Sequence, residues 1–122
     1  MSVYDVAHRL SRELKKSDEY TSYLEIKKKV MSNEKSKEML LDFQKEQFKL
    51  QSKAMSGQEI SEEERKKLNN LMEIIQLNND IQKYLNAEQR ISVMLNDLHQ
   101  ILFSELEIGI DQENEDDEDN LE

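Results

Sequence analysis

Apolar residues recur along most of the chain at intervals of three and four positions, the spacing that places them on one side of an α-helix. The pattern predicts five helices, at 3–16, 18–31, 34–55, 62–83 and 87–108, of which the last can also be read as a continuation of the fourth. Polar residues mark several ends: Ser2 and Asp5 are spaced as a capping pair, and Ser61 and Glu64 as a capping box. The sequence therefore predicts an all-α protein.

The third and fourth predicted helices carry more apolar residues than one neighbour can cover. In the third, Leu41, Phe48 and Met55 follow one another at intervals of seven residues, beside a second apolar stripe. A helix that packs on a single surface needs a stripe about 100° wide, so each of these helices should contact more than one partner. We predict a long antiparallel helical hairpin with shorter flanking helices, in a bundle that is dimeric because twofold contacts commonly cover surplus apolar surface. The candidate interface residues are Leu41, Phe48, Met55, Leu68, Met72 and Ile75.

Composition and charge divide the chain into two parts. The 122 residues include no Pro and two Gly, and 36% are hydrophobic and another 36% charged, which favours a thin helical domain. Residues 111–122 contain eight acidic residues and no basic one, so most of the net charge of −10 lies there. We predict a single helical domain at 1–109 and a disordered acidic tail at 110–122. A calcium loop in this tail is disfavoured because Asp116 stands where such a loop requires Gly.

The residue types that catalysis and cofactor binding need are scarce. His8 and His99 are the only histidines, cysteine is absent, and two glycines cannot build a phosphate-binding loop. The acidic residues alternate with lysines at helical spacing, which is typical of solvated helix faces rather than of a dry acid-base site. We expect no enzymatic activity, no catalytic residue, no metal site and no cofactor.

Basic residues form one edge of the third predicted helix, at Lys45, Lys49 and Lys53. Weak binding to RNA or to an acidic protein along this edge is one reading, and a solvated, ion-paired face is the favoured one. The acidic balance of the chain opposes binding to nucleic acid or to an anionic membrane. The absence of cysteine and of any long apolar segment predicts a cytoplasmic protein.

Three segments of the chain resemble a known family. They are VYDVAHRL at 3–10, SEEERKKLNNL at 61–71 and, most specifically, YLNAEQRISVMLNDLHQIL at 84–102. With the AMSGQEIS turn at 54–61, they make the sequence similar to the YheA branch of the YlbF/YmcA family of small helical proteins from Gram-positive bacteria. The resemblance implies an all-helical cytoplasmic protein whose long hairpin dimerises, and it supplies no catalytic residue.

Better-known relatives in this family act as partner proteins in a complex that influences an endoribonuclease, messenger RNA maturation, competence, sporulation and biofilm formation. Cysteines of those relatives have been linked to iron-sulfur clusters, and because this chain has no cysteine, cluster binding is not carried over. The apolar helix faces thus predict a non-enzymatic helical adaptor that forms homo-oligomers and binds an unidentified protein partner. The resemblance implies that it is an accessory regulator in a bacterial RNA-processing or developmental pathway. The alternative is a weak RNA-binding module that uses the lysine edge.

Overall fold

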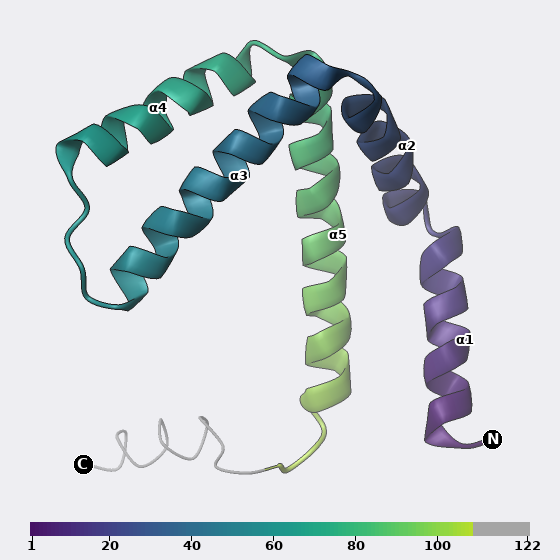
Figure 1. Cartoon of the computed structure of the whole chain (residues 1–122). Coiled ribbons are helices and arrows are strands. Elements are labelled where there is room, and N and C mark those ends of the chain that lie inside the picture. Colours follow the sequence, from purple (N-terminus) through teal and green to yellow (C-terminus); the bar gives the residue numbers. More distant parts are fainter. Residues whose placement is uncertain (109–122) are drawn as a thin grey trace, which may run out of the picture. The chain divides into compact units, whose positions relative to one another are not determined.

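The computed structural model describes residues 1–108, which form five helices and no strand (Figure 1). The helices are α1 (Val3–Lys16), α2 (Asp18–Ser32), α3 (Glu34–Met55), α4 (Glu62–Gln76) and α5 (Asn79–Phe103). The predicted all-α fold is confirmed. The predicted disordered tail at 110–122 lies outside the described residues.

The chain divides into two compact units, Met1–Ile91 and a second unit that begins at Ser92. The first unit holds α1 to α4 and the first half of α5, and the second holds the rest of α5. The single domain expected at 1–109 stays a prediction.

Short polar side chains fix where the first three helices begin. Ser2 and Asp5 form a capping box, in which each residue's backbone N–H donates to the other's side chain. Ser17 serves two helices, because its hydroxyl donates to Leu14 O at 2.7 Å and accepts the Tyr20 N–H at 3.2 Å. Asn33 accepts the Ser36 N–H at 3.1 Å in the same way. These single-residue junctions explain why α1, α2 and α3 follow one another with almost no loop.

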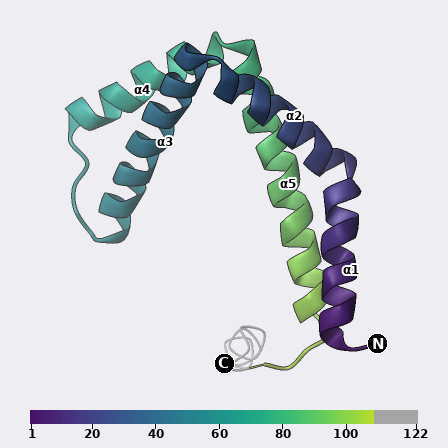
Figure 2. The same ribbon diagram turned by 45° about the vertical axis from the view of Figure 1, so that its right-hand side comes forward.

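α3 and α4 form an antiparallel hairpin, which is seen from two directions in Figures 1 and 2. Gly57, with φ of 77°, ends α3 in the left-handed conformation that glycine adopts most easily. The N–H of Gln58 then donates to Lys53 O at 2.9 Å, which satisfies one of the last carbonyls of α3. Ser61 and Glu64 form the predicted capping box and restart the chain as α4.

The hydrophobic core of the first unit lies where α2, α3, α4 and the start of α5 meet. Six buried side chains build it: Val30, Leu40, Phe43, Ile75, Ile81 and Tyr84. Leu40, Ile81 and Val30 are completely inaccessible to solvent. The core is small for a unit of this length, so its individual side chains carry a large share of the stability.

The boundary between the fourth and fifth helices differs from the prediction. α4 ends at Gln76, not near 83, and α5 starts at Asn79, not at 87. Asn78 makes the corner: its Oδ1 accepts the Ile81 N–H at 3.0 Å, and its Nδ2 donates to Ser36 Oγ on α3 at 2.9 Å. Ser36 lies 42 residues away in the sequence, so helical periodicity alone cannot reveal this bond.

α2 and the first half of α5 run antiparallel, joined by three side-chain contacts. Glu19 pairs with Arg90 at 3.8 Å and Lys29 with Asp80 at 3.6 Å. Between them, the rings of Tyr23 and Tyr84 lie 5.5 Å apart between centroids. Burial raises the pKa of Tyr84 far above its ordinary value, so its hydroxyl stays protonated and donates to Glu88 at 3.0 Å.

The described part of the second unit is the C-terminal half of α5 and the residues after it, to 108. His99 stacks on Phe103, with ring centroids 4.5 Å apart. This segment has no fully buried side chain. Its largely exposed apolar residues are Val93, Leu95, Ile101, Leu102, Phe103, Leu106 and Ile108.

Candidate protein-interaction surface

α3 is buried on one side and apolar on the opposite side. Leu40, Phe43 and Leu50 point into the hairpin and its core. On the opposite side of the helix, Leu41 is 46% exposed, Phe48 71% and Met55 84%. These three residues are called here the outer face of α3. A large apolar side chain gains about 1.5–3 kcal/mol when it is fully buried, so three of them on one exposed helix face favour a partner.

The other three predicted interface residues lie on α4 and differ in how far they are exposed to solvent. Met72 is 41% exposed. Leu68 packs partly buried against the core, and Ile75 belongs to the core itself at 3% exposed. Ile75 is therefore inaccessible to a partner in this structure. Helical spacing shows which residues share a face, but not which of two apolar faces the chain itself covers.

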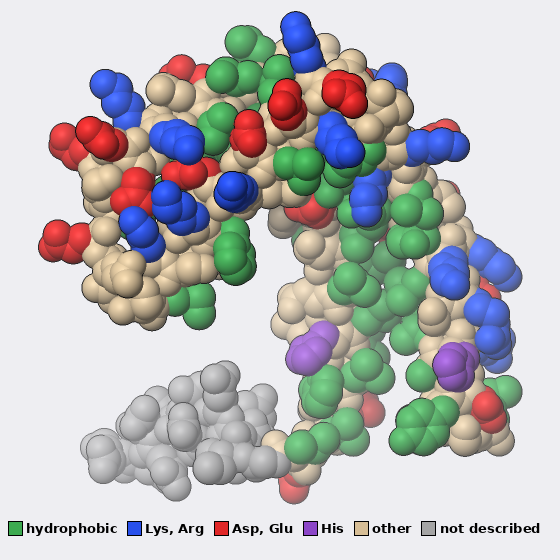
Figure 3. Space-filling model, viewed as in Figure 1, with side chains coloured by type: hydrophobic (Ala, Val, Ile, Leu, Met, Phe, Trp, Pro, Cys, Tyr) green, Lys and Arg blue, Asp and Glu red, His purple; other side chains and the backbone are tan. Residues whose placement is uncertain are grey.

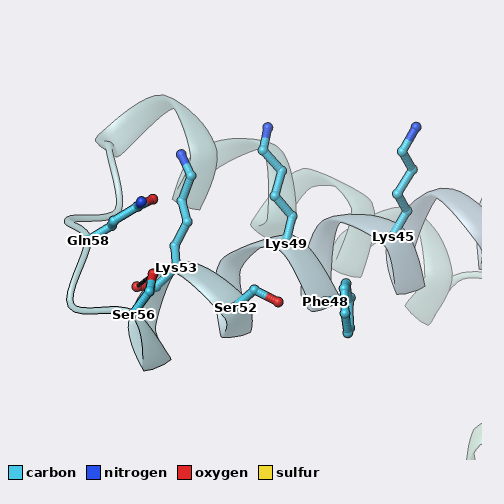
Figure 4. A pocket seen from close by; sticks show the side chains of 7 residues that line it. All are labelled: Lys45, Phe48, Lys49, Ser52, Lys53, Ser56 and Gln58. Atoms are coloured by element: carbon cyan, nitrogen blue, oxygen red, sulfur yellow. Dashed lines mark hydrogen bonds between the residues drawn. The ribbon is translucent and has the colours of Figure 1, made fainter.

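The predicted basic edge also divides into two parts. Figure 4 shows Lys45, Lys49 and Lys53 in a row along α3, while Phe48 points to a different side of the helix. Lys53 Nζ lies 2.8 Å from Glu64 Oε1, and the Lys53 side chain is only 29% exposed. Lys45 and Lys49 are exposed, and no ion pair within residues 1–108 includes either of them. The basic edge thus has two available ammonium groups and one that joins α3 to α4.

A groove runs along this part of α3. Its walls are Phe48, the three lysines and, toward the end of the helix, three polar residues: Ser52, Ser56 and Gln58 (Figure 4). The groove combines one exposed aromatic ring with ammonium groups and small hydrogen-bonding side chains. Such a surface can bind a ligand that carries both apolar and negatively charged groups.

Glu46 faces α4, on the side of α3 that also carries Lys53. Its side chain is 6% exposed, and its Oε2 lies 3.4 Å from Lys67 Nζ. Its other carboxylate oxygen, Oε1, is buried without a hydrogen-bond partner. Because this carboxylate is buried against α4 and pairs with Lys67, it forms no ion pair with Lys45 or Lys49.

Glu64 is held in its ionised form at the loop end of the hairpin. The hydrogen bond from the Lys53 ammonium group is the main reason that the pKa of Glu64 lies below its ordinary value, although desolvation opposes it. Hydrogen bonds from the Ser61 hydroxyl and backbone N–H lower the pKa further. The ionised carboxylate therefore contributes both to the cap of α4 and to the contact between α3 and α4.

This arrangement predicts a pH dependence of stability. A carboxylate whose pKa is depressed by folding stabilises the protein above its unfolded-state pKa, and the contribution is lost as the pH falls through the folded-state pKa. We expect Glu64→Gln to lower the urea midpoint near neutral pH, and the difference from the parent protein to shrink as the pH is lowered to about 3. Urea unfolding followed by circular dichroism at several pH values measures this. A difference that is the same at every pH would contradict the role of the ionised carboxylate.

α1 carries a second exposed apolar face, and none of its residues was among the predicted interface residues. No residue of α1 is buried, and Val3 is 82% exposed, Tyr4 79% and Val6 52%. The sequence contained the signal, because Val3 and Val6 are spaced three residues apart and share one face of this helix. Within residues 1–91, α1 packs only against α2, and its N-terminal end is exposed.

Between residues 1 and 108, no three His, Asp or Glu side chains gather closely enough to hold a metal ion. Over the same range, none of the helices has both the length and the apolar character needed to cross a lipid bilayer. The exposed apolar and basic residues of α3 remain the most distinctive chemical feature of the first unit.

Comparison with known proteins places the chain among small bacterial helical proteins. A family model described as "Control of competence regulator ComK, YlbF/YmcA" matches residues 3–107. A UPF0342 protein of Halothermothrix orenii is 57% identical over 115 residues, which is 94% of this chain and 97% of that protein. A UPF0342 protein of Caldicellulosiruptor saccharolyticus is 40% identical over 81 residues, which is 66% of this chain and 68% of that protein.

Two solved structures share the fold. A protein of unknown function (DUF964) from Bacillus stearothermophilus has a TM-score of 0.75 at 20% identity, covering 84% of this chain and 90% of that one. yheA from Bacillus subtilis has a TM-score of 0.64 at 23% identity, covering 85% of this chain and 94% of that one. At these identities, the likeness concerns the fold alone.

Proposed function

Because the chain belongs to the YlbF/YmcA family, whose description is control of the competence regulator ComK, we propose that it is a regulatory helical protein that acts by binding other proteins, without catalysis. The resemblance to the YheA branch seen in the sequence is confirmed by the same comparisons. Any protein interaction that is specific to this chain depends on its exposed surfaces.

The observation that carries the proposal is the outer face of α3. This helix already packs on its other side against α2 and α4, so Leu41, Phe48 and Met55 are not required to complete the hairpin. A helix that is already packed on one side and carries three large apolar side chains on its exposed side is typical of a protein-binding helix. An adaptor needs such a surface and needs no catalytic group.

Self-association is the second part of the proposal, and α1 supports it. Its apolar stripe is exposed at Val3 and Val6 although the helix is strongly amphipathic. A second copy of the chain is a partner that is always present at equal concentration, and twofold contacts are the commonest form of assembly. We assign the contact between copies to this stripe, and the outer face of α3 to a different protein.

The oligomeric state of matched variants tests this assignment. We expect the parent protein to have a mass above the 14.5 kDa of one chain in size-exclusion chromatography with light scattering. The double variant Val3→Asp/Val6→Asp should lower that mass to one chain, because each carboxylate would have to be buried in the contact. Phe48→Asp should leave the mass unchanged.

Two outcomes would count against parts of the proposal. A parent protein that is monomeric at tens of micromolar would refute self-association. Dissociation by Phe48→Asp alone would move the contact between copies to the outer face of α3. Circular dichroism must show that each variant keeps its helix content, and Leu77→Asp, at a residue that is 86% exposed, provides the matched control for the added charge.

A further inference from the structure

We propose that the outer face of α3, with Lys45 and Lys49 beside it, is the docking site for an acidic helical segment of another protein that inserts an apolar side chain next to Phe48. This inference rests on the proposed function, since it names the chemistry of the partner for the same surface.

The groove provides two kinds of contact within a short distance along the helix. Lys45 and Lys49 are one helical turn apart, and Phe48 lies between them in the sequence (Figure 4). Phe48 is 71% exposed, so an apolar side chain of a partner could cover its ring. Carboxylates placed one turn apart on a partner helix match the spacing of the two ammonium groups.

Two acids near these lysines are engaged in ion pairs with other residues. Glu46 faces α4 and pairs with Lys67, and Glu64 pairs with Lys53. Asp42 is exposed one turn before Lys45, but none of the ion pairs in residues 1–108 includes it. In Figure 3, basic, acidic and hydrophobic side chains lie among one another over the hairpin. A positive edge on a chain with a net charge of −10 favours a partner of opposite sign at this place.

A second copy of the chain fits this face less well than an acidic partner does. If two outer faces paired antiparallel about a twofold axis, the lysines of both helices would lie along the same edge of the contact. Like charges placed together oppose association, so the face disfavours its own copy. RNA is also disfavoured, because only two ammonium groups are available and tight binding to phosphates requires several.

Fluorescence anisotropy with a defined probe tests the proposal on the full-length protein. The probe is a fluorescein-labelled helical peptide of about 15 residues, with leucines on one face and glutamates beside them. The control peptide has the same leucines, with lysine at each glutamate position. We expect the acidic peptide to bind at least about tenfold more tightly than the basic one, and its binding to weaken as salt is raised from about 50 to about 300 mM.

Variants of the protein locate the binding site. Lys45→Glu/Lys49→Glu should weaken binding of the acidic peptide by about tenfold or more, and should improve binding of the basic one. Phe48→Ala should weaken binding of both peptides. The matched control is Lys66→Glu/Lys28→Glu, at two exposed lysines on α4 and α2, which adds the same charge and should change binding only slightly. Circular dichroism verifies that each variant is folded.

Each alternative occupant gives a distinct result that would overturn the assignment. Equal loss of binding in the control variant would show that net charge, rather than the groove, attracts the peptide. A labelled oligouridine that binds more tightly than the acidic peptide, and that also depends on Lys45 and Lys49, would make the face an RNA site. Binding that appears only after the eight acids of 111–122 are changed to Asn and Gln would identify the chain's own C-terminal residues as the occupant.

Failure of this inference can be told apart from failure of the proposed function. If neither peptide binds but the parent protein self-associates through α1, the regulatory interaction role stands and the acidic partner is refuted. If the protein neither self-associates nor binds either peptide, both are refuted. The light-scattering measurement and the anisotropy measurement therefore address the two statements separately.

Discussion

Replacing Leu40 by alanine should lower the free energy of unfolding by about 2–5 kcal/mol, the range found when a buried leucine is truncated in a packed core. Leu40 is 0% exposed and contributes to the core shared by α2, α3, α4 and α5. Native domains are stable by about 5–15 kcal/mol in total, so this single change could remove a large part of the stability. Urea unfolding followed by circular dichroism measures the loss.

Leu41→Ala is the matched control for this prediction. The two leucines are neighbours on α3, yet Leu41 is 46% exposed and belongs to the outer face. Its truncation should cost less than about 1 kcal/mol, because little buried contact is lost and alanine is a good helix former. Equal costs for the two substitutions would mean that the outer face is as tightly packed as the core, and would refute its description as a free surface.

Replacing Asn78 by alanine should lower the free energy of unfolding by about 2–4 kcal/mol, although the residue lies at a corner between helices. The loss has two sources. α5 loses the side chain that accepts the Ile81 N–H, and Ser36 Oγ loses its hydrogen-bond donor. Ser36 is only 4% exposed, so water cannot easily replace that donor.

Two further substitutions separate the sources of this effect. Asn78→Asp keeps an oxygen for the Ile81 N–H, and the Ser36 hydroxyl can rotate to donate to the new carboxylate, so the loss should be smaller. Asn70→Ala, at an exposed position of α4, should change stability by less than about 0.5 kcal/mol. A loss of the same size for Asn70→Ala and Asn78→Ala would show that the corner has no special role.

Most of the fold could be predicted because its signals are local. The bounds of the first three helices depend on Ser2, Ser17 and Asn33, whose capping partners lie three residues away. Gly57 likewise marks the hairpin loop by a property of its own backbone. The α4–α5 corner was misplaced because the evidence for it is not local. Asn78 is one of several amides in a continuous apolar pattern, and its distinguishing contact with Ser36 exists only in the folded hairpin.

The candidate surface could be predicted only in part, for a related reason. The interval of seven residues placed Leu41, Phe48 and Met55 together, and the structure leaves all three exposed. The same reasoning grouped Ile75 with them, but the side of α4 that carries Ile75 turns toward Leu40 and Ile81 in the core. Lys53 was grouped with Lys45 and Lys49 by spacing, whereas its pairing with Glu64 depends on how α3 and α4 align.

The unpartnered oxygen of Glu46 has a consequence for how the hairpin finds its alignment during folding. A buried carboxylate contributes little net stability, but it is tolerated only opposite a cation. Sliding α4 by about one turn would replace Lys67 with Glu63 in one direction and with Leu71 in the other. The first shift would bury the Glu46 carboxylate against another acid, and the second would bury it against an apolar side chain. We infer that Glu46 raises the free energy of misaligned hairpins. The apolar contact between α3 and α4, which alone would tolerate several alignments, therefore forms in one of them.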